Sequence, residues 1–511
     1  MYITKVFLGR GLAGLILTAA ALVLGACAGA PDGNRADTVS GPSSTASRPN
    51  IIVIVLDDMG YGDYSLAGGK IPTPNIDRLA QTGARMTSGY VTAAVCAPSR
   101  TAILTGRQQT RFGFEFNPVG RDETSGLSLN EVTIAQTMKA AGYRTGMVGK
   151  WHIGQQPGYQ PLDRGFEYFY GILGGATPYL RTIGPDDLHA KTAEDSLITR
   201  QRLPVMDGRT RVDPEEYLTD VFTDRAIDFV GGTDQGATQP FFLYLAYTAP
   251  HTPLQAPAKY LRGAPANGSE FERAYHGMFT SVDQGLGRII DHLKRSGQYD
   301  NTVIFFTSDN GCPGYVGGAC SNRPLNGFKG YPLDGGLRVP YFVSWPARIK
   351  PQVRSELVSS LDIAATAAAV AGTTHPRSEG ANLIPLLERP EQPSSRALFW
   401  RTGPNHIVRQ GRWKMIVVNK TSQAAGGDEL GRSLKPDGVA AAVSPLGQRT
   451  FLFDLDNDPG ERVNVSAQNP KVIASLQRQF SEWDKANVPP QWTSRRGLIA
   501  EINGERVELF N

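Results

Sequence analysis

Four apolar runs stand out along the chain. They cover residues 50–56, 144–148, 240–246 and 302–307, and the first continues through Ile, Val and Leu without a polar interruption after Asn50. Runs of this kind are typical of strands that are buried on both faces of a parallel sheet. Because helical stretches separate them, the sequence predicts an α/β domain with a large, mostly parallel sheet flanked by helices.

Two further segments show helical periodicity. Residues 269–296 carry apolar side chains at helical spacing and end before Gly297, and residues 356–372 form a second segment of this kind. The apolar face of the first helix is expected to pack on the sheet. Its Asp283 and Asp291 are therefore predicted to face solvent.

The pattern changes after about residue 386. Short apolar runs at 396–400, 406–409, 414–418 and 451–455 are separated by turn residues, and a helical pattern follows at 472–487. The sequence thus predicts a smaller C-terminal α+β subdomain, residues 386–511, made of antiparallel strands and a packed helix. The boundary is placed in the proline-rich run 385–393, after a main domain of residues 50–385. The polar segment 421–447 fits no predicted element.

The N-terminus has the pattern of an export signal. Lys5 and Arg10 precede an apolar core at 12–24, which is too short for a comfortable membrane span. The sequence Leu24-Gly25-Ala26-Cys27 resembles a bacterial lipobox, in which cleavage precedes an acylated cysteine. We therefore expect a lipoprotein signal peptide at 1–26 and a flexible tether at 27–49. The exported protein would be anchored to a bacterial membrane through a lipid on Cys27, on the periplasmic or cell-surface side. Ordinary cleavage nearby, with Cys27 incidental, is the alternative.

The net charge excludes few functions, and it does not indicate a surface that binds polyanions. The formal net charge is +4, and loss of Lys5 and Arg10 with the leader would leave a nearly balanced chain. We expect no nucleic-acid partner.

The four cysteines divide unevenly in an exported protein, where disulfides persist. If Cys27 is lipidated, Cys312 and Cys320 are near enough in sequence to pair, which leaves Cys96 over. Such a residue is either inert and buried or a site of chemistry. Pro98 fits the first position of a helix, so Cys96 is predicted to lie at a helix start, which favours anions and sharpens nucleophiles. The second reading is therefore favoured.

Polar clusters follow all four apolar runs, at ends that meet on one edge of a parallel sheet. They are Asp57-Asp58, Gly149-Lys150-Trp151-His152, the segment 248–253 with His251, and Ser308-Asp309-Asn310. Asp57, Asp58, Asp309 and Asn310 offer only oxygen ligands, which suit Ca²⁺ or Mg²⁺ rather than zinc. Taken singly, each acidic pair could instead cap a helix.

Cationic and proton-transferring groups complete this edge. Beside a metal, they would form a site for a tetrahedral oxyanion, sulfate or phosphate. They are Arg100, Lys150, His152, His251 and Lys329. The remaining histidines are better explained by packing or surface positions. They are His189, His276, His292, His375 and His406.

The segment Cys96-Ala97-Pro98-Ser99-Arg100, followed by Leu104-Thr105-Gly106-Arg107, resembles the signature of the type I, formylglycine-dependent sulfatases of the alkaline phosphatase superfamily. The clusters described above and Phe328-Lys329-Gly330 stand in that family's order, and Gly335-Gly336 and Phe453-Asp454-Leu455 continue it more loosely. The coarse likeness is to arylsulfatases and to hydrolases of N-acetylgalactosamine sulfates.

This resemblance implies an alkaline phosphatase-like catalytic domain and a mechanism. A maturation enzyme would oxidise Cys96 to formylglycine, whose hydrated aldehyde attacks sulfur and later expels sulfate. Ca²⁺, or Mg²⁺ as the alternative, would be held by Asp57, Asp58, residue 96, Asp309 and Asn310. By the same resemblance, Arg100 and Lys150 orient the diol and sulfate, His152 is the base for the second hydroxyl, and His251 with Lys329 protonates the leaving oxygen.

Two alternatives stay open at this point. One is a phosphodiesterase or phosphonate monoester hydrolase of the same superfamily, and the other is a non-catalytic lipoprotein that binds sulfated glycans. The substrate of a sulfatase would be an aryl sulfate or a sulfated carbohydrate. Segment 176–215 and the loop between Cys312 and Cys320 are the candidate specificity elements, although segment 176–215 could equally be a surface covering.

Overall fold

The computed structural model describes residues 48–118, 126–192, 195, 198, 203–232, 239–392, 395–403, 405–419, 448–492 and 497–510. The predicted signal peptide, Cys27, nearly all of the tether and the unassigned segment 421–447 lie outside these residues. Among them, no helix is both long and apolar enough to cross a membrane.

A large mixed sheet forms the centre of the chain. Within the described residues its strand order is β13-β2-β12-β11-β1-β9-β4-β5-β7-β8. The five central strands are mutually parallel, which confirms the prediction from the apolar runs. They are β11 (Thr302–Ser308), β1 (Asn50–Leu56), β9 (Phe241–Ala246), β4 (Arg144–Lys150) and β5 (Tyr168–Ile172).

The outer strands make the sheet mixed. Strands β12 and β7 run antiparallel to the central strands they join. The outer strands are β13 (Gln352–Arg354), β2 (Ala84–Met86), β12 (Tyr341–Ser344), β7 (Val205–Asp207) and β8 (Thr210–Val212). Two short pairs lie outside this sheet: β3 (Gly89–Tyr90) with β14 (Val358–Ser359), and β6 (Leu188–Ala190) with β10 (Leu254–Ala256).

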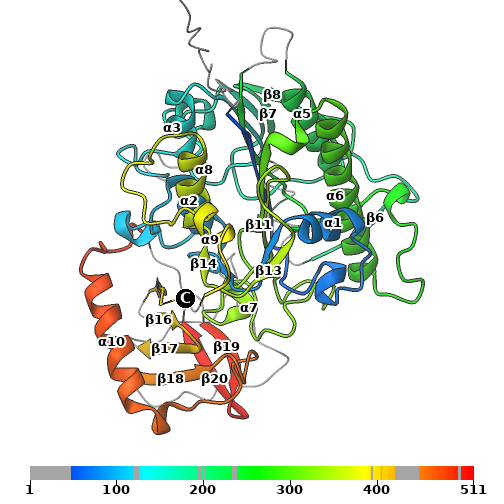
Figure 1. Cartoon of the computed structure of the whole chain (residues 1–511). Coiled ribbons are helices and arrows are strands. Elements are labelled where there is room, and N and C mark those ends of the chain that lie inside the picture. Colours follow the sequence, from blue (N-terminus) through cyan, green and yellow to red (C-terminus); the bar gives the residue numbers. More distant parts are fainter. Residues whose placement is uncertain are drawn as a thin grey trace, which may run out of the picture. The chain divides into compact units, whose positions relative to one another are not determined.

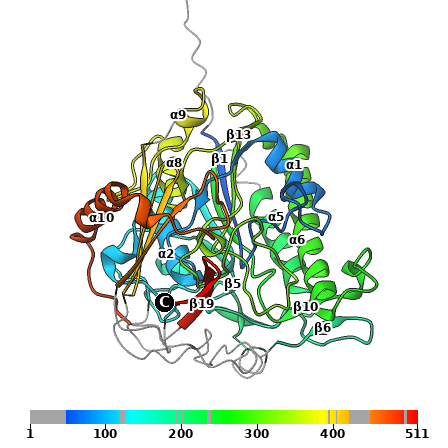
Figure 2. The ribbon, with the colours of Figure 1, turned by 90° about the horizontal axis from the view of Figure 1, so that it is seen from below.

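Helices cover both faces of the sheet. Alternate residues of β1 point into two separate cores, as the two-residue period of a strand requires. Helices α1 (Pro74–Thr82), α5 (Leu218–Gly231) and α6 (Glu270–Arg295) cover one face. Helices α2 (Cys96–Thr105), α3 (Ile134–Ala140) and α8 (Leu361–Val370) cover the other. The two groups lie on opposite sides of β1 in both views (Figure 1, Figure 2).

The predicted exposure of Asp283 is wrong, whereas Asp291 is exposed as expected. Asp283 is 2% exposed, and its carboxylate accepts hydrogen bonds from the backbone N–H groups of Asn75 and Ile76. These are unpaired groups in the first turn of α1, so Asp283 of α6 satisfies them from a neighbouring helix. Helical periodicity cannot show that a second helix covers the polar edge of α6.

The C-terminal region contains the predicted antiparallel sheet and packed helix. The sheet is formed by β15 (Ala397–Thr402), β16 (Asn405–Gln410), β17 (Trp413–Asn419) and β18 (Gln448–Asp454). Helix α10 (Pro470–Asp484) packs on it through Leu476 and Phe480. Residues 47–511 cluster into one compact unit, and the boundary at 385–393 stays a prediction.

The sequence analysis missed a final hairpin, β19 (Gly497–Ile502) with β20 (Glu505–Phe510). Its turn is Asn503-Gly504, both residues with positive φ, which is the usual sequence signal of a two-residue hairpin. Short helical elements complete the fold. They are α7 (Asp334–Leu337), α9 (Ile384–Leu387) and the 3-10 turns Ser65–Ala67, Gln109–Phe112, Pro161–Asp163, Ala258–Tyr260, Tyr299–Asn301 and Ser466–Gln468.

Candidate functional site

The carboxyl ends of β1 and β11 bring two polar pairs together. Asp57 and Asp58 follow β1, and Asp309 and Asn310 follow β11, its parallel neighbour. The Asp309 N–H donates to the Leu56 carbonyl at 3.1 Å, and the Asp58 N–H donates to Asp309 Oδ1 at 3.2 Å. All four side chains are at most 1% exposed. The predicted convergence at one edge of the sheet is confirmed for these two strands.

Three buried cations face the three carboxylates. Lys150 Nζ lies 2.7 Å from Asp57 Oδ2, Arg100 Nη2 2.7 Å from Asp309 Oδ2, and Lys329 Nζ 2.9 Å from Asp58 Oδ1. Burying isolated charges would be costly, so the pairing stabilises each of them. These six residues form a dense, buried polar centre. An anion that displaced one of the carboxylates from its cation would find that cation already in place.

The pKa values of the carboxyl groups separate in opposite directions. Burial raises the pKa of Asp57, although Lys150 opposes the effect. Burial also acts to raise the pKa of Asp309, but Arg100, Lys150 and Lys329 together hold it below its usual value. Of Asp57 and Asp309, it is therefore Asp309 that is held in its charged form.

Cys96 is the first residue of α2 and faces this centre. Its Sγ lies 3.7 Å from Asp57 Oδ1, and the side chain is 1% exposed. Burial raises the pKa of the thiol well above its ordinary value. The thiol is therefore protonated at neutral pH and is a poor nucleophile as it stands.

His251 is fixed by its own loop. Its Nδ1 lies 2.7 Å from the carbonyl oxygen of Thr252, which can only accept, so in the neutral ring Nδ1 carries the proton. Nε2 then faces Asp58 Oδ2 at 3.7 Å. The Tyr179 hydroxyl donates to the His251 carbonyl oxygen at 2.9 Å and so holds the same turn.

His152 lies two residues beyond β4 with a left-handed backbone, φ 66°, and Asp58 shares this feature at φ 71°. Such conformations are uncommon for non-glycine residues and cluster at functional sites. A Cβ atom added to Gly175 would lie 2.8 Å from His152 Nε2, so the glycine leaves room for the ring.

The centre offers ligands for a cation. Donor atoms of Asp57, Asp58, Cys96 and His251 all lie within 4.8 Å of one another. Asn310 adds a further donor, because its Oδ1 is buried without a hydrogen-bond partner among the described residues while its Nδ2 donates to Asp58 Oδ1 at 2.7 Å. Of the four residues within 4.8 Å of one another, Asp57, Asp58 and Cys96 belong to the predicted ligand set, and His251 does not. The carboxylate of Asp309, a predicted ligand, is held by Arg100.

The disulfide Cys312–Cys320 is present and Cys96 is free, as predicted. Two asparagines that the sequence analysis missed hold the surrounding loops. Asn117 Oδ1 accepts from the Ala97 N–H at the start of α2, and Asn322 donates to the Cys312 carbonyl at 3.0 Å. Neither carries a sequence signal, since each role depends on where a loop returns.

Among the other histidines, His375 is buried and bonded to Thr137 and to the Thr105 carbonyl, and His406 stacks on Phe480. Both have the packing roles predicted for them.

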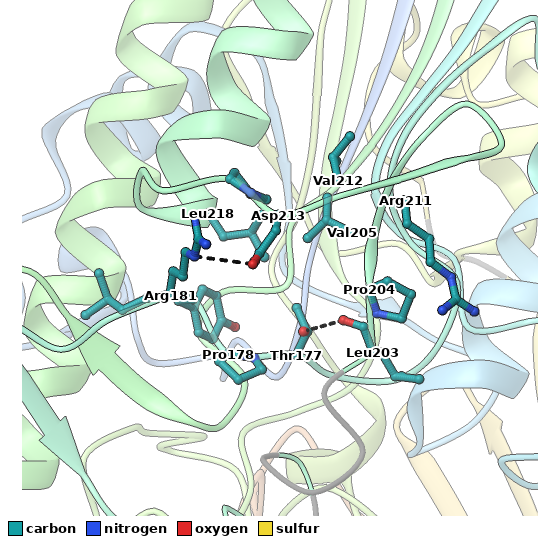
Figure 3. Close-up of a pocket in the computed structure, with 13 residues that line it drawn as sticks. Thr177, Pro178, Arg181, Leu203, Pro204, Val205, Arg211, Val212, Asp213 and Leu218 are labelled. Atoms are coloured by element: carbon teal, nitrogen blue, oxygen red, sulfur yellow. Dashed lines mark hydrogen bonds and ion pairs between the residues drawn. The ribbon is translucent and has the colours of Figure 1, made fainter.

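Segment 176–215, the predicted specificity element, lines a cavity of about 290 Å³ (Figure 3). Arg181 and Arg211 bring charge to its wall, and Arg181 pairs with Asp213 at 3.3 Å. Tyr179 also lines it, and this is the residue whose hydroxyl supports His251. One side chain therefore connects the cavity wall to the polar centre.

This site and fold have clear relatives. The sulfatase family model matches residues 49–373. An arylsulfatase of Hemicentrotus pulcherrimus is 34% identical over 82% of this chain and 78% of its own length. Arylsulfatase A of Homo sapiens is 32% identical over 85% of this chain and 87% of its own. The crystal structure of Ps i-CgsB in complex with k-i-k-neocarrahexaose is 32% identical, covers 87% of this chain and 95% of that chain, and has a TM-score of 0.72.

The chain belongs to the sulfatase family, within the alkaline phosphatase superfamily. It is a sulfuric ester hydrolase, similar in sequence to arylsulfatases.

Proposed function

We propose that this protein hydrolyses sulfate esters of carbohydrates, with formylglycine at position 96 and a bound Ca²⁺. The observation that carries the proposal is the buried centre itself. Three carboxylates, three cations, Cys96 and His251 gather at the carboxyl ends of parallel strands, the usual position of a ligand site in this class of fold.

Conversion of Cys96 accounts for an otherwise unsuitable nucleophile. The thiol is buried and protonated, yet it lies at the start of α2 and against Asp57. A hydrated aldehyde at this position would supply an oxygen nucleophile for attack on sulfur. The segment from Cys96 to Arg100 carries the family signature for that oxidation, so the proposal requires a maturation enzyme as a partner.

The donor set supports a hard cation. Oxygen atoms of Asp57, Asp58, Asp309 and Asn310 would hold Ca²⁺ together with residue 96. The unpaired Asn310 Oδ1 is the clearest fit, because a buried amide oxygen without a partner is costly and a cation would satisfy it. When bound, the ion would lower the pKa of a coordinated hydroxyl.

The remaining polar groups have assignable roles in this proposal. Lys150 and Arg100 would orient the sulfate oxygens, and His251 with Lys329 would bind sulfate and deliver a proton to the leaving oxygen. The Thr252 carbonyl accepts the Nδ1 proton of His251, so the proton delivered to the leaving oxygen would be the one that Nε2 carries in the imidazolium form. His152, whose ring is accommodated by Gly175, is the proposed base for sulfate release.

Carbohydrate sulfates are the proposed substrates. A structural relative at 32% identity is bound to k-i-k-neocarrahexaose, and N-acetylgalactosamine-6-sulfatase of Mus musculus is 30% identical over 87% of this chain. We further propose export and anchoring through a lipid on Cys27, on the basis of the leader sequence.

The test combines mass spectrometry with a substrate panel. The protein should be produced with and without a formylglycine-generating enzyme, and the peptide containing residue 96 should lose the thiol and gain an aldehyde only in the first case. The matured enzyme should cleave sulfated mono- and oligosaccharides faster than a chromogenic aryl sulfate. Faster turnover of a matching phosphodiester would instead identify a phosphodiesterase, and an intact thiol in an active enzyme would contradict the proposed nucleophile.

A further inference from the structure

A second buried charge cluster lies away from the proposed catalytic residues. Lys414 of β17 is 0% exposed, and its Nζ lies 2.8 Å from Asp334 Oδ1 and 2.8 Å from Glu461 Oε1. Asp334 Oδ2 accepts from the Tyr90 hydroxyl at 2.8 Å, and the Asp334 N–H donates to Glu461 Oε2. One lysine of the C-terminal sheet thus bridges two buried carboxyl groups, and Arg338, 3.6 Å from Asp334 Oδ2, adds a second positive charge.

Asp334 begins α7, and the backbone of this helix supports the catalytic loops. The Gly336 carbonyl accepts from the N–H of Gly311, the residue after Asn310, at 3.1 Å. The Leu337 carbonyl accepts from the Val91 N–H at 2.9 Å, on the segment that leads to Cys96. The contact at Gly311 is close, because a Cβ there would lie 1.8 Å from the Gly335 carbonyl oxygen.

The same helix closes the loop that carries Lys329. The Gly335 N–H donates to the Asn326 carbonyl at 2.6 Å, and the Gly330 N–H donates to the Ala94 carbonyl at 2.7 Å. Segment 326–337, which carries both Lys329 and Asp334, is therefore closed by hydrogen bonds into one loop. Any displacement of Asp334 passes to the backbone on both sides of Lys329.

The C-terminal sheet also packs on this region through an apolar core. Trp400, Ile416 and Phe453 of the sheet share that core with Leu333 and Leu337, and the Trp400 indole N–H donates to the Val91 carbonyl at 2.7 Å. Apolar packing is not directional, however, whereas the Lys414 ion pairs fix Asp334 at defined distances.

We propose that Lys414 is a positioning residue for the sulfatase reaction. It holds segment 326–337 through Asp334, and this segment in turn positions Lys329 and the turn that carries Asn310. The inference rests on the proposed role of Lys329 in protonating the leaving oxygen. Under this proposal, the C-terminal sheet contributes to the geometry of the active site.

The leaving group provides the discriminating measurement. An alcohol of high pKa needs a proton as it departs, whereas a nitrophenolate does not, so misplacement of Lys329 lowers kcat/KM more for a sugar sulfate than for nitrophenyl sulfate. Removal of Lys414 alone would leave two buried carboxylates facing each other and would destabilise the fold, so the main variant is Lys414→Met with Glu461→Gln. That pair of changes leaves Asp334 with Arg338, 3.6 Å away.

A matched control breaks another ion pair between the C-terminal region and the core. Arg396, just before β15, pairs at 2.6 Å with Asp362 of α8, whose side chain is 0% exposed. The control variant is Arg396→Met with Asp362→Asn. Glu461→Gln alone keeps the Lys414–Asp334 pair and is a second control.

With matured enzyme, we expect the main variant to lose about 100-fold in kcat/KM on a sugar sulfate and less than about 10-fold on nitrophenyl sulfate. Amide hydrogen exchange across 326–337 should accelerate in this variant and in neither control. Equal losses on both substrates, or unchanged exchange across 326–337, would overturn the inference. A matured wild-type enzyme that cleaves no sulfate ester would instead overturn the proposed function, and the exchange measurement would still decide whether Lys414 holds the segment.

Discussion

Lys150 Nζ lies 2.7 Å from Asp57 Oδ2, and both side chains are fully buried. The contact joins the ends of β4 and β1, which are separated by β9 in the sheet. An ion pair so enclosed leaves a strongly destabilising charge behind when one partner is removed. The pair therefore links stability to the proposed chemistry.

Replacing Lys150 tests this link. Lys150→Met should lower kcat/KM by about 100- to 1,000-fold, the usual effect of removing one donor from an anion site, and should lower the free energy of unfolding by about 3 kcal/mol. Steady-state kinetics and urea unfolding measure the two effects. Lys70→Met is the matched control, because its side chain is 90% exposed and its contact with Glu272 is 3.7 Å, so both quantities should stay near wild type.

Metal removal should affect stability as well as turnover. A chelator is expected to abolish sulfatase activity and to lower Tm, since Asp57, Asp58 and Asn310 lose the cation that satisfies them. Binding at 100 times Kd contributes about 2.7 kcal/mol, so readdition of Ca²⁺ should raise Tm in a concentration-dependent way. An unchanged Tm in the chelated protein, or full activity there, would contradict the proposed cation.

Asp63 predicts a pH-dependent stability. Burial raises its pKa from 3.8 to about 7, although Tyr275 and the N–H groups of Gly60 and Ser321 donate to the carboxylate. Between these pH values the folded state retains a proton that the unfolded state has lost. The free energy of unfolding should therefore fall as pH rises from about 4 to 7, by up to about 4 kcal/mol, and then level off.

Asp63→Asn removes the titrating group and is the comparison for that measurement. The variant should be less stable at every pH, because Gly60 and Ser321 donate to different oxygens of the carboxylate and an amide has only one oxygen. Its slope between pH 4 and 7 should nevertheless be shallower than that of wild type. Urea unfolding at a series of pH values gives the slope. Parallel curves for the two proteins would refute the assignment to Asp63.

His152 is the proposed base for sulfate release. His152→Ala should reduce turnover and leave labelled sulfate attached to the peptide that contains residue 96, because attack on sulfur would proceed while release would not. Mass spectrometry after a brief incubation with substrate measures the retained group. His292→Ala, in the last turn of α6, should show no retention. Loss of turnover without any trapped sulfate would assign another role to His152.

The sequence could predict which polar clusters meet in the candidate site because those signals are local. Each apolar run is followed directly by its polar cluster. Parallel pairing of β1 with β11 is then enough to place Asp57 beside Asp309. The same logic could not place Asp283, whose burial depends on α1 lying across α6. Nor could it connect Lys414 to Asp334, which are 80 residues apart and meet only because the C-terminal sheet packs on α7. Contacts of this kind between distant elements could not be predicted from local patterns.

Gly149 shows how tightly the backbone fixes Lys150. It has φ 107°, and a Cβ atom there would lie 1.9 Å from the Ala246 carbonyl oxygen of β9. Gly149→Ala must therefore separate β4 from β9 or twist the strand end, which would displace Lys150 from Asp57. We expect a loss of more than about 3 kcal/mol in the free energy of unfolding and a loss of activity in any protein that folds. Gly68→Ala separates the two causes, because Gly68 has φ 89° but open space around it, and should cost only about 1 to 2 kcal/mol with activity retained. Equal losses in the two variants would show that backbone strain, rather than the contact with Ala246, determines the requirement for glycine.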